Sequence, residues 1–298
     1  MAARRRFLAP SRAGLPPARF DAPPFDAWAE YGDLLRGAEF PGVAALNARR
    51  APGTAWRFVP QTAQLLADGL HYEARIAVCG EIATRADNWH DLFNALVWLR
   101  YPVLKAALNA RQVAEIARMG PKARSRAQCA LTHFDEAGVV VRVRDAGLLA
   151  LWDAHDWHGL LWRERAAWGD GRIDLAVFGH ALLEHALAPH QLLVAKALVC
   201  ADTPRVDTPA GAPQAPMASA CDGVAAAVAA GALLRDPQEL RPLPLSGLPG
   251  WHTDDAGEAF YRSAACFRPL RPGRVYPAPW PLPSAARAAA HQPSGGPS

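Results

Sequence analysis

The sequence predicts an α+β fold, namely a predominantly helical single domain with a short β-hairpin and Pro-rich loops. Apolar residues recur at helical spacing in several segments, most clearly over residues 88–101 and 103–120. Residues 129–145 instead hold two β-prone runs around Asp135-Glu136-Ala137-Gly138, which is typical of a hairpin turn with Gly138 in the left-handed conformation. The 27 prolines separate these segments and are frequent after residue 235, so we expect irregular loops there.

The remaining elements are expected in the following order. Helices are expected near residues 25–36 and 43–49, and residues 57–85 combine a short helix with an extended stretch. Pro102 separates the two long helices, because a residue that precedes proline disfavours the helical conformation. Further helices are expected over 146–168, from Gly179 to Pro189 and over 222–234, with a strand or a second helix after Pro189.

The two ends of the chain differ in composition from the rest. Residues 1–24 are rich in Arg and Pro and are predicted to form a disordered basic tail, and residues 284–298 a second disordered tail. Residues 25–283 contain no repeat and no evident linker, so we expect one α+β domain there. The basic start is not followed by the continuous apolar segment of a signal peptide.

Composition argues against several classes of partner. No apolar run reaches the 18 or more residues of a membrane span, so no membrane partner is expected. The net charge of +4 is concentrated in residues 1–20, 100–126 and 262–298, whereas a nucleic-acid-binding protein more often has a broad basic face. The five cysteines are widely spaced and include no CxxC pair, which favours a reducing compartment and predicts a cytoplasmic protein.

The segment DNWHDLFNALVWLRYP, residues 87–102, carries the first candidate site. On a helix, His90, Asp91 and Asn94 fall within an arc of about 100°, and the apolar residues fall on the opposite side. The arc continues into Trp98, which is unusual for a face exposed to water. We therefore predict a pocket with His90, Asp91 and Asn94 as catalytic residues, in which a carboxylate fixes the histidine tautomer. A simple solvated face is the alternative.

Lys105 and Asn109 lie four residues apart on the following helix. We assign both to the same catalytic group, because an ammonium and an amide can hold a small anionic substrate. The alternative is that both side chains lie on a solvated helix surface.

The segment FGHALLEHAL predicts a metal site. His180 and Glu184 are one helical turn apart, and imidazole and carboxylate ligands together suit zinc, manganese or iron. The pattern is common by chance, and the HExxH motif is absent. A second pair, His155 and His158, ranks lower because the surrounding tryptophans indicate packing.

Several segments together resemble one known family, the bacterial domain of unknown function 3025. They are TRADNWHDLFNALVWLRYPVLKAALNARQ, ALTHFDEAGVVV, FGHALLEHAL, and LPGW followed by FYRSAACFRPLR. The resemblance covers about residues 60–275 and implies a bacterial, proteobacterial protein. It implies no activity and no site residues.

Two functions follow from these observations. The first is a metal-assisted hydrolase of a small or phosphate-bearing substrate, in which His90 and Asp91 meet His180 and Glu184 across the core. The alternative is a non-enzymatic protein-interaction module, in which the same residues form a structural hydrogen-bond network. Nucleotide-binding and serine-hydrolase motifs are absent from the sequence, so those classes are not expected.

Overall fold

Two β-sheets organise the part of the chain that this computed structural model describes, which is residues 7–120, 123–202, 216–254 and 257–282. A small parallel sheet pairs β1 (Arg57–Pro60) with β2 (Glu81–Thr84). The larger sheet has the order β4-β3-β5-β6, and β7 pairs with the far end of β5. Its strands are β3 (Gly138–Val143), β4 (Ile173–Val177), β5 (Val194–Asp202), β6 (Arg241–Pro244) and β7 (Trp280–Leu282). The β3–β5 pair is parallel, whereas β4 and β6 run antiparallel to their neighbours.

Helices make up most of the remaining described structure, so the α+β class with predominant helix is confirmed. The long helices are α5 (Trp89–Arg100), α6 (Pro102–Met119), α7 (Arg126–Ala137) and α10 (Met217–Ala229). The shorter ones are α1 (Gly32–Arg36), α2 (Val43–Asn47), α3 (Ala63–Leu66), α4 (Tyr72–Cys79), α8 (Ala146–Asp153), α9 (His180–Ala186) and α11 (Glu258–Ser263). Short 3-10 helices are η1 (Arg12–Gly14), η2 (Pro17–Asp21), η3 (Phe25–Tyr31), η5 (Arg165–Trp168), η6 (Pro237–Glu239) and η7 (Leu245–Gly247), and η4 (His158–Arg163) is a π-helix. No helix of the described residues is long and apolar enough to cross a membrane.

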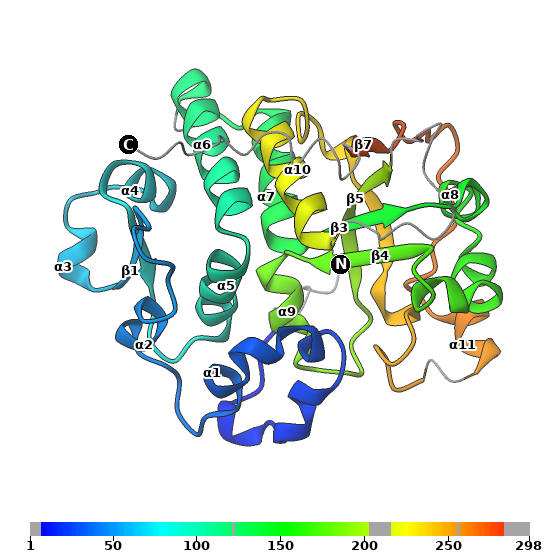
Figure 1. Cartoon of the computed structure of the whole chain (residues 1–298), viewed down its shortest axis with the longest axis horizontal. Coiled ribbons are helices and arrows are strands. Elements are labelled where there is room, and N and C mark those ends of the chain that lie inside the picture. The colour runs from blue at the N-terminus through cyan, green and yellow to red at the C-terminus, as the bar shows by residue number, and fades with distance from the viewer. Residues whose placement is uncertain (1–6, 121–122, 203–215, 255–256, 283–298) are drawn as a thin grey trace, which may run out of the picture.

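The helices lie between the two sheets as well as around them. In Figure 1 the small sheet and α2 to α4 lie on one side and the large sheet lies on the other, with α6, α7, α9 and α10 between them. Strand β3 is the centre of the core, since its Val-rich sequence is favourable in strands and Val139, Val140 and Val141 are all fully buried.

The predicted hairpin over residues 129–145 is wrong. Residues up to Ala137 form α7, whose N-terminus has a capping box between Ser125 and Gln128. Gly138 is the first residue of β3 and has a φ of −77°, which is not left-handed. The partner of β3 on this side is β4, which the sequence analysis did not predict. β3 therefore pairs with the distant strand β4 and not with a neighbouring strand across a local turn.

The prediction of a disordered N-terminal tail is also wrong for residues 7–24. This segment contains η1 and η2, and Phe20 is only 3% exposed. Arg19 donates two hydrogen bonds to the Ala186 carbonyl at the end of α9. Burial of one aromatic ring and capping of a helix end hold the segment in place. Residues 1–6 and the predicted tail at 284–298 lie outside the described residues.

Candidate functional site

Helix α5 packs its polar stripe against other parts of the protein, so that each side chain of the stripe is buried or half-buried. Asn88 caps the N-terminus of this helix, because its side chain accepts a hydrogen bond from the Asp91 amide. Pro102 separates α5 from α6 as predicted and is itself the first residue of α6. Asp91 is 8% exposed, and Trp98 at the end of the stripe is 1% exposed. The alternative of a solvated stripe is therefore wrong.

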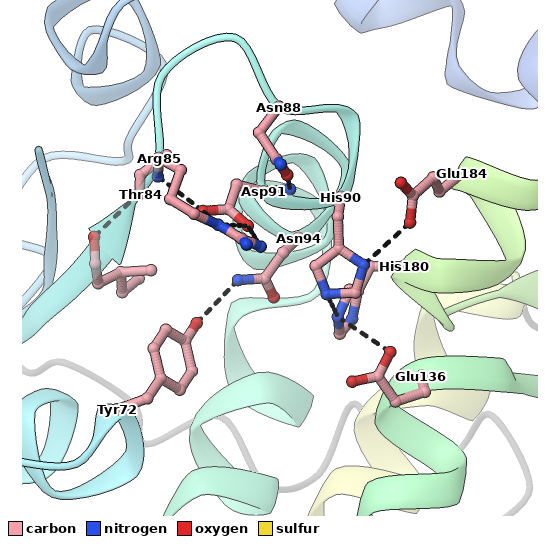
Figure 2. Close-up of polar contacts among 11 residues, drawn as sticks. Tyr72, Thr84, Arg85, Asn88, His90, Asp91, Asn94, Glu136, His180 and Glu184 are labelled. Carbon is pink, nitrogen blue, oxygen red and sulfur yellow. Dashed lines mark hydrogen bonds and ion pairs between the residues drawn. The ribbon is translucent and has the colours of Figure 1, made fainter. Parts of the chain in front are cut away.

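His90 and His180 meet at the centre of a small cluster, shown in Figure 2. Their Nε2 atoms are 3.1 Å apart. His90 Nδ1 lies 3.1 Å from Glu184 Oε2, and His180 Nε2 lies 3.5 Å from Glu136 Oε2. His180 Nδ1 faces Asp135 Oδ2 at 3.9 Å. Each imidazole thus presents one nitrogen to the other imidazole and the second nitrogen to a carboxylate.

The β3–β4 pair explains how residues from two helices reach this cluster. Val139 of β3 faces Val177 of β4, so the end of α7 lies beside the start of α9. The Phe178 and Gly179 amides both donate to the Gly138 carbonyl, at 3.0 and 2.8 Å. A Cβ on Gly179 would lie 2.5 Å from the Gly138 nitrogen, so only glycine permits this close approach. The approach sets His180 next to Glu136.

The spacing of His90, Glu136 and His180 fits a metal ion. Their candidate ligand atoms all lie within 4.8 Å of one another. Two nitrogens bound to zinc at about 2.0–2.1 Å in tetrahedral geometry are about 3.3–3.4 Å apart. The separation of 3.1 Å between the two Nε2 atoms is close to that value, and so is the 3.5 Å between His180 and Glu136. Small side-chain adjustments would complete such a site.

Burial and neighbouring charges shift the pKa values of the residues in this cluster in different directions. Burial lowers the pKa of His180 to about 3, so this imidazole is neutral. The hydrogen bond that His90 donates to the Glu184 carboxylate raises the pKa of His90 against the opposing effect of burial. Burial also raises the pKa of Glu136. The cluster therefore combines a neutral imidazole with a more basic one and three nearby carboxylates.

Proton positions show why a cation suits the space between the two rings. His180 Nδ1 is buried and makes no hydrogen bond of good geometry, and the acceptors that face it belong to Asp135. If neutral His180 donated from Nε2 to neutral His90, its Nδ1 lone pair would face the Asp135 carboxylate. Two arrangements avoid this repulsion between the lone pair and the carboxylate. Either His90 carries an additional proton, or both Nε2 atoms bind a cation. In both cases His180 carries its proton on Nδ1 and directs it at Asp135.

Lys105 stabilises the acidic end of α7. Its Nζ lies 2.7 Å from Asp135 Oδ1, and the side chain is 4% exposed. Acidic residues in the last turn of a helix are disfavoured by the helix dipole, so Asp135 and Glu136 need such compensation. Burial opposes ionisation of Asp135, but the positive charge of Lys105 outweighs it and holds the pKa of Asp135 below its ordinary value. Lys105 therefore pairs with a carboxylate of the protein and is not free to bind an anionic substrate.

A small polar cavity of about 90 Å³ adjoins the cluster and is lined by both Glu136 and Glu73. This volume accommodates water molecules but no organic substrate. Asn109 donates to the Glu73 carboxylate and, at 3.0 Å, to the Glu73 carbonyl. Burial, reinforced by Asp135, raises the pKa of Glu73 to about 6. Asn109 is thus occupied by a protein group, as Lys105 is.

Two stripe residues of α5 lie outside the cluster. Asp91 accepts hydrogen bonds from the Arg85 amide at 2.6 Å and from its guanidinium at 2.7 Å, so it does not fix the His90 tautomer, which Glu184 contacts instead. Asn94 donates to the Tyr72 hydroxyl at 2.7 Å, as Figure 2 shows. Burial raises the pKa of that hydroxyl. Asp91 and Asn94 are therefore supporting residues.

The structure separates the His155 and His158 pair. His155 contacts Tyr276 and the Arg268 carbonyl, whereas His158 pairs with Glu258 of α11 at 2.7 Å. No common ligand site exists between these two side chains.

Sequence reasoning did not select Glu136, Asp135 or Glu73. The sequence does contain a signal for Asp135 and Glu136, namely that the apolar residues before them have the spacing of one helix face. These residues are Ala127, Ala130, Leu131 and Phe134, and all are buried in α7. Two acidic residues in the final turn of a helix are unfavourable, and such a placement indicates a specific partner. We found no comparable sequence signal for Glu73.

Comparison with known proteins identifies a family and no activity. A family model described as "Protein of unknown function (DUF3025)" matches residues 56–271. Neither a curated protein nor a solved structure matches the chain. The function must therefore be inferred from the geometry of the site.

Proposed function

Given that the chain belongs to the DUF3025 family, whose description assigns no activity, we propose that it is a metal-dependent hydrolase. His90, His180 and Glu136 are the proposed ligands. Glu184, the sequence-based candidate ligand, takes a different role here, because its carboxylate contacts the far nitrogen of His90.

One observation carries this proposal, namely that both Nε2 atoms converge while both Nδ1 atoms face carboxylates. Metal-binding histidines commonly donate their second ring N–H to a carboxylate, which fixes the tautomer and raises the basicity of the ligand. Glu184 has this position for His90, at 3.1 Å, and Asp135 has it for His180, at 3.9 Å. A random group of polar side chains has no reason to reproduce this arrangement twice.

The open side of the cluster supports hydrolysis over a purely structural metal. Catalytic zinc sites use three protein ligands and leave a position for water, whereas structural sites are closed by four. The side chains of Glu136 and His90 are 42% and 30% exposed, so solvent reaches the cluster. A divalent ion bound there would lower the pKa of its water to about 7.

Glu73 is the carboxylate that we assign to proton transfer. It lines the same cavity as Glu136, and its pKa of about 6 is close to the range that suits a general base near neutral pH. Asn109 orients it by donating to its carboxylate.

The substrate that we propose is small and binds at the solvent side, next to His90 and Glu136. An anionic substrate held by Lys105 and Asn109 is not part of the proposal, because Asp135 and Glu73 occupy these donors. We also propose that the protein acts in the cytoplasm, since its five cysteines are all free thiols, as expected in a reducing compartment.

The first test is the metal content of the purified, untagged protein by mass spectrometry. We expect near-stoichiometric zinc, manganese or iron, and loss of most of it in His90→Ala, His180→Ala and Glu136→Gln. His158→Ala is the matched control, because it removes a histidine from a His–carboxylate pair outside the cluster. Circular dichroism verifies that each variant is folded.

The second test separates metal binding from hydrolysis. We expect the loaded protein to hydrolyse p-nitrophenyl acetate or bis(p-nitrophenyl) phosphate, and Glu73→Gln to keep its metal but lose this activity. A folded wild-type protein that contains no metal and takes up none on titration would overturn the proposal. His90 would then hold the additional proton, and the cluster would be the structural network of an interaction protein.

A further inference from the structure

A second cavity, of about 710 Å³, lies between the start of β5 and the C-terminal segment around residues 265–276. It shares no lining residue with the histidine cluster. Its volume is within the range of small-molecule sites, about 300–1,000 Å³. It is large enough for an organic ligand, unlike the cavity beside Glu136.

The charge of this cavity is one-sided. Its lining contains Lys196, Arg268, Arg271 and Arg274 and no Asp or Glu among the described residues. Within the described structure, Lys196, Arg268 and Arg271 form no ion pair, although most of the described arginines do. Burial, and then the charge of Arg271, lower the pKa of Lys196. Cations placed together without counter-charge are costly unless an anion joins them.

The other side of the cavity is apolar and aromatic. Leu192 and Val194 line it and are both 37% exposed, which makes them two of the few large apolar side chains open to solvent. The Tyr276 ring lies below Arg274, whose guanidinium carbon is 4.2 Å from the ring centroid. A ligand in this cavity would therefore meet cations and an apolar surface together.

His155 fixes the aromatic side of the cavity from a strained backbone conformation. Its φ is +55°, which is uncommon for a residue other than glycine. In this conformation Nε2 contacts the Tyr276 hydroxyl at 2.9 Å and Nδ1 contacts the Arg268 carbonyl at 3.1 Å. Strain of this kind is frequent at binding sites, where surrounding contacts maintain it. His155, which the sequence analysis ranked as a weaker metal-ligand candidate, thus holds two parts of the cavity wall.

We infer that this cavity binds a small organic anion with an apolar body, its phosphate or carboxylate group against Lys196 and Arg271 and its body over Leu192, Val194 and Tyr276. The inference is independent of the proposed hydrolase function, because no cluster residue takes part in it.

The test uses phenyl phosphate as the probe and isothermal titration calorimetry of the full-length protein. We expect one site per chain, binding about fivefold to tenfold weaker in Lys196→Met and in Arg271→Gln, and weaker binding at higher salt. Arg165→Gln is the matched control, because Arg165 is an exposed arginine without an ion pair in the described structure that lies outside this cavity. Its affinity should equal that of the wild type.

Benzyl alcohol and inorganic phosphate test the two halves of the proposed ligand separately, the first the apolar body and the second the anionic group. Both should bind more weakly than phenyl phosphate. Equal binding of benzyl alcohol would overturn the role of the cations, and equal binding of inorganic phosphate would overturn that of the apolar wall. Absence of phenyl phosphate binding at millimolar concentration, or equal affinity in all three variants, would overturn the site itself. The His90→Ala variant should bind the probe normally, so failure here is distinguishable from failure of the metal proposal.

Discussion

Replacing Glu184 by Gln is the sharpest test of how the cluster works. The substitution retains the shape of the side chain but removes the charge that faces His90 Nδ1 at 3.1 Å. If His90 is a metal ligand, a neutral amide should weaken the bond between His90 and the ion without removing any ligand. Loss of such a supporting carboxylate typically lowers metal affinity 10- to 100-fold, which corresponds to about 1.4–2.7 kcal/mol.

The structure places the expected effect near the lower limit of this range. The side chains of His90 and Glu184 are 30% and 20% exposed, so water screens part of their interaction. We therefore expect about a tenfold increase in the dissociation constant for zinc, measured on metal-free protein by competition with a chromophoric chelator at pH 7.5. His90→Ala should have a much larger effect, because it removes a ligand.

Glu115→Gln is the control for loss of one negative charge. Glu115 is 13% exposed and pairs with Arg111 and Arg118 of its own helix, α6, away from the cluster. Its replacement should leave zinc affinity unchanged. If Glu184→Gln and Glu115→Gln bind zinc equally well, the carboxylate does not support a metal ligand and our interpretation of the geometry is refuted.

Three further predictions concern stability and reactivity. Lys105→Met should lower the free energy of unfolding in urea by about 3 kcal/mol, because Asp135 then keeps a buried charge without a partner. Additional replacement of Asp135 by Leu should recover most of this loss. An unchanged urea midpoint for Lys105→Met would contradict the prediction. Burial raises the folded-state pKa of Glu73 from 4.5 to about 6, so its stabilising contribution is complete below about pH 4.5 and is lost as the pH rises through about 6. Glu73→Gln should therefore gain about 1–2 kcal/mol relative to the wild type between pH 4 and pH 7, a difference that parallel denaturation curves at several pH values would reveal or exclude. Burial raises the pKa of Cys200 to about 12, whereas Cys79 is exposed, so a thiol reagent should label Cys79 at once and Cys200 only after unfolding, and fast labelling of Cys200 in the native protein would count against the buried core.

Local patterns in the sequence were sufficient for the long helices. The period of apolar residues predicted α5 and α6, and Pro102 correctly marked the boundary between them. The same patterns failed where pairing partners are distant. Strand β4 and its register with β3 depend on contacts that no local signal specifies, and so does the end of α7 at Ala137.

The cluster was predictable in part for the same reason. His90, His180 and Glu184 stood out because each lies in a short segment with an unusual polar pattern. Their mutual contact depends on how α5 packs on α9, which period and spacing do not reveal. Glu136 was interpreted as a turn residue, because Glu before Ala-Gly is ordinary in a hairpin. Once the helical nature of residues 126–137 is known, its position at the end of a helix becomes the unusual feature.

The close contact between Gly138 and Gly179 defines a sequence motif for the site, and other protein sequences can be searched for this motif. A side chain at Gly179 would collide with the backbone at Gly138, so the motif around the histidine must begin with glycine. The resulting pattern is Asp-Glu-x-Gly, followed later in the chain by Gly-His-x-x-x-Glu, with a separate His-Asp-x-x-Asn upstream. A chain that holds all three in this order should assemble the same cluster. One in which the second glycine is replaced should not, even if every polar residue is present.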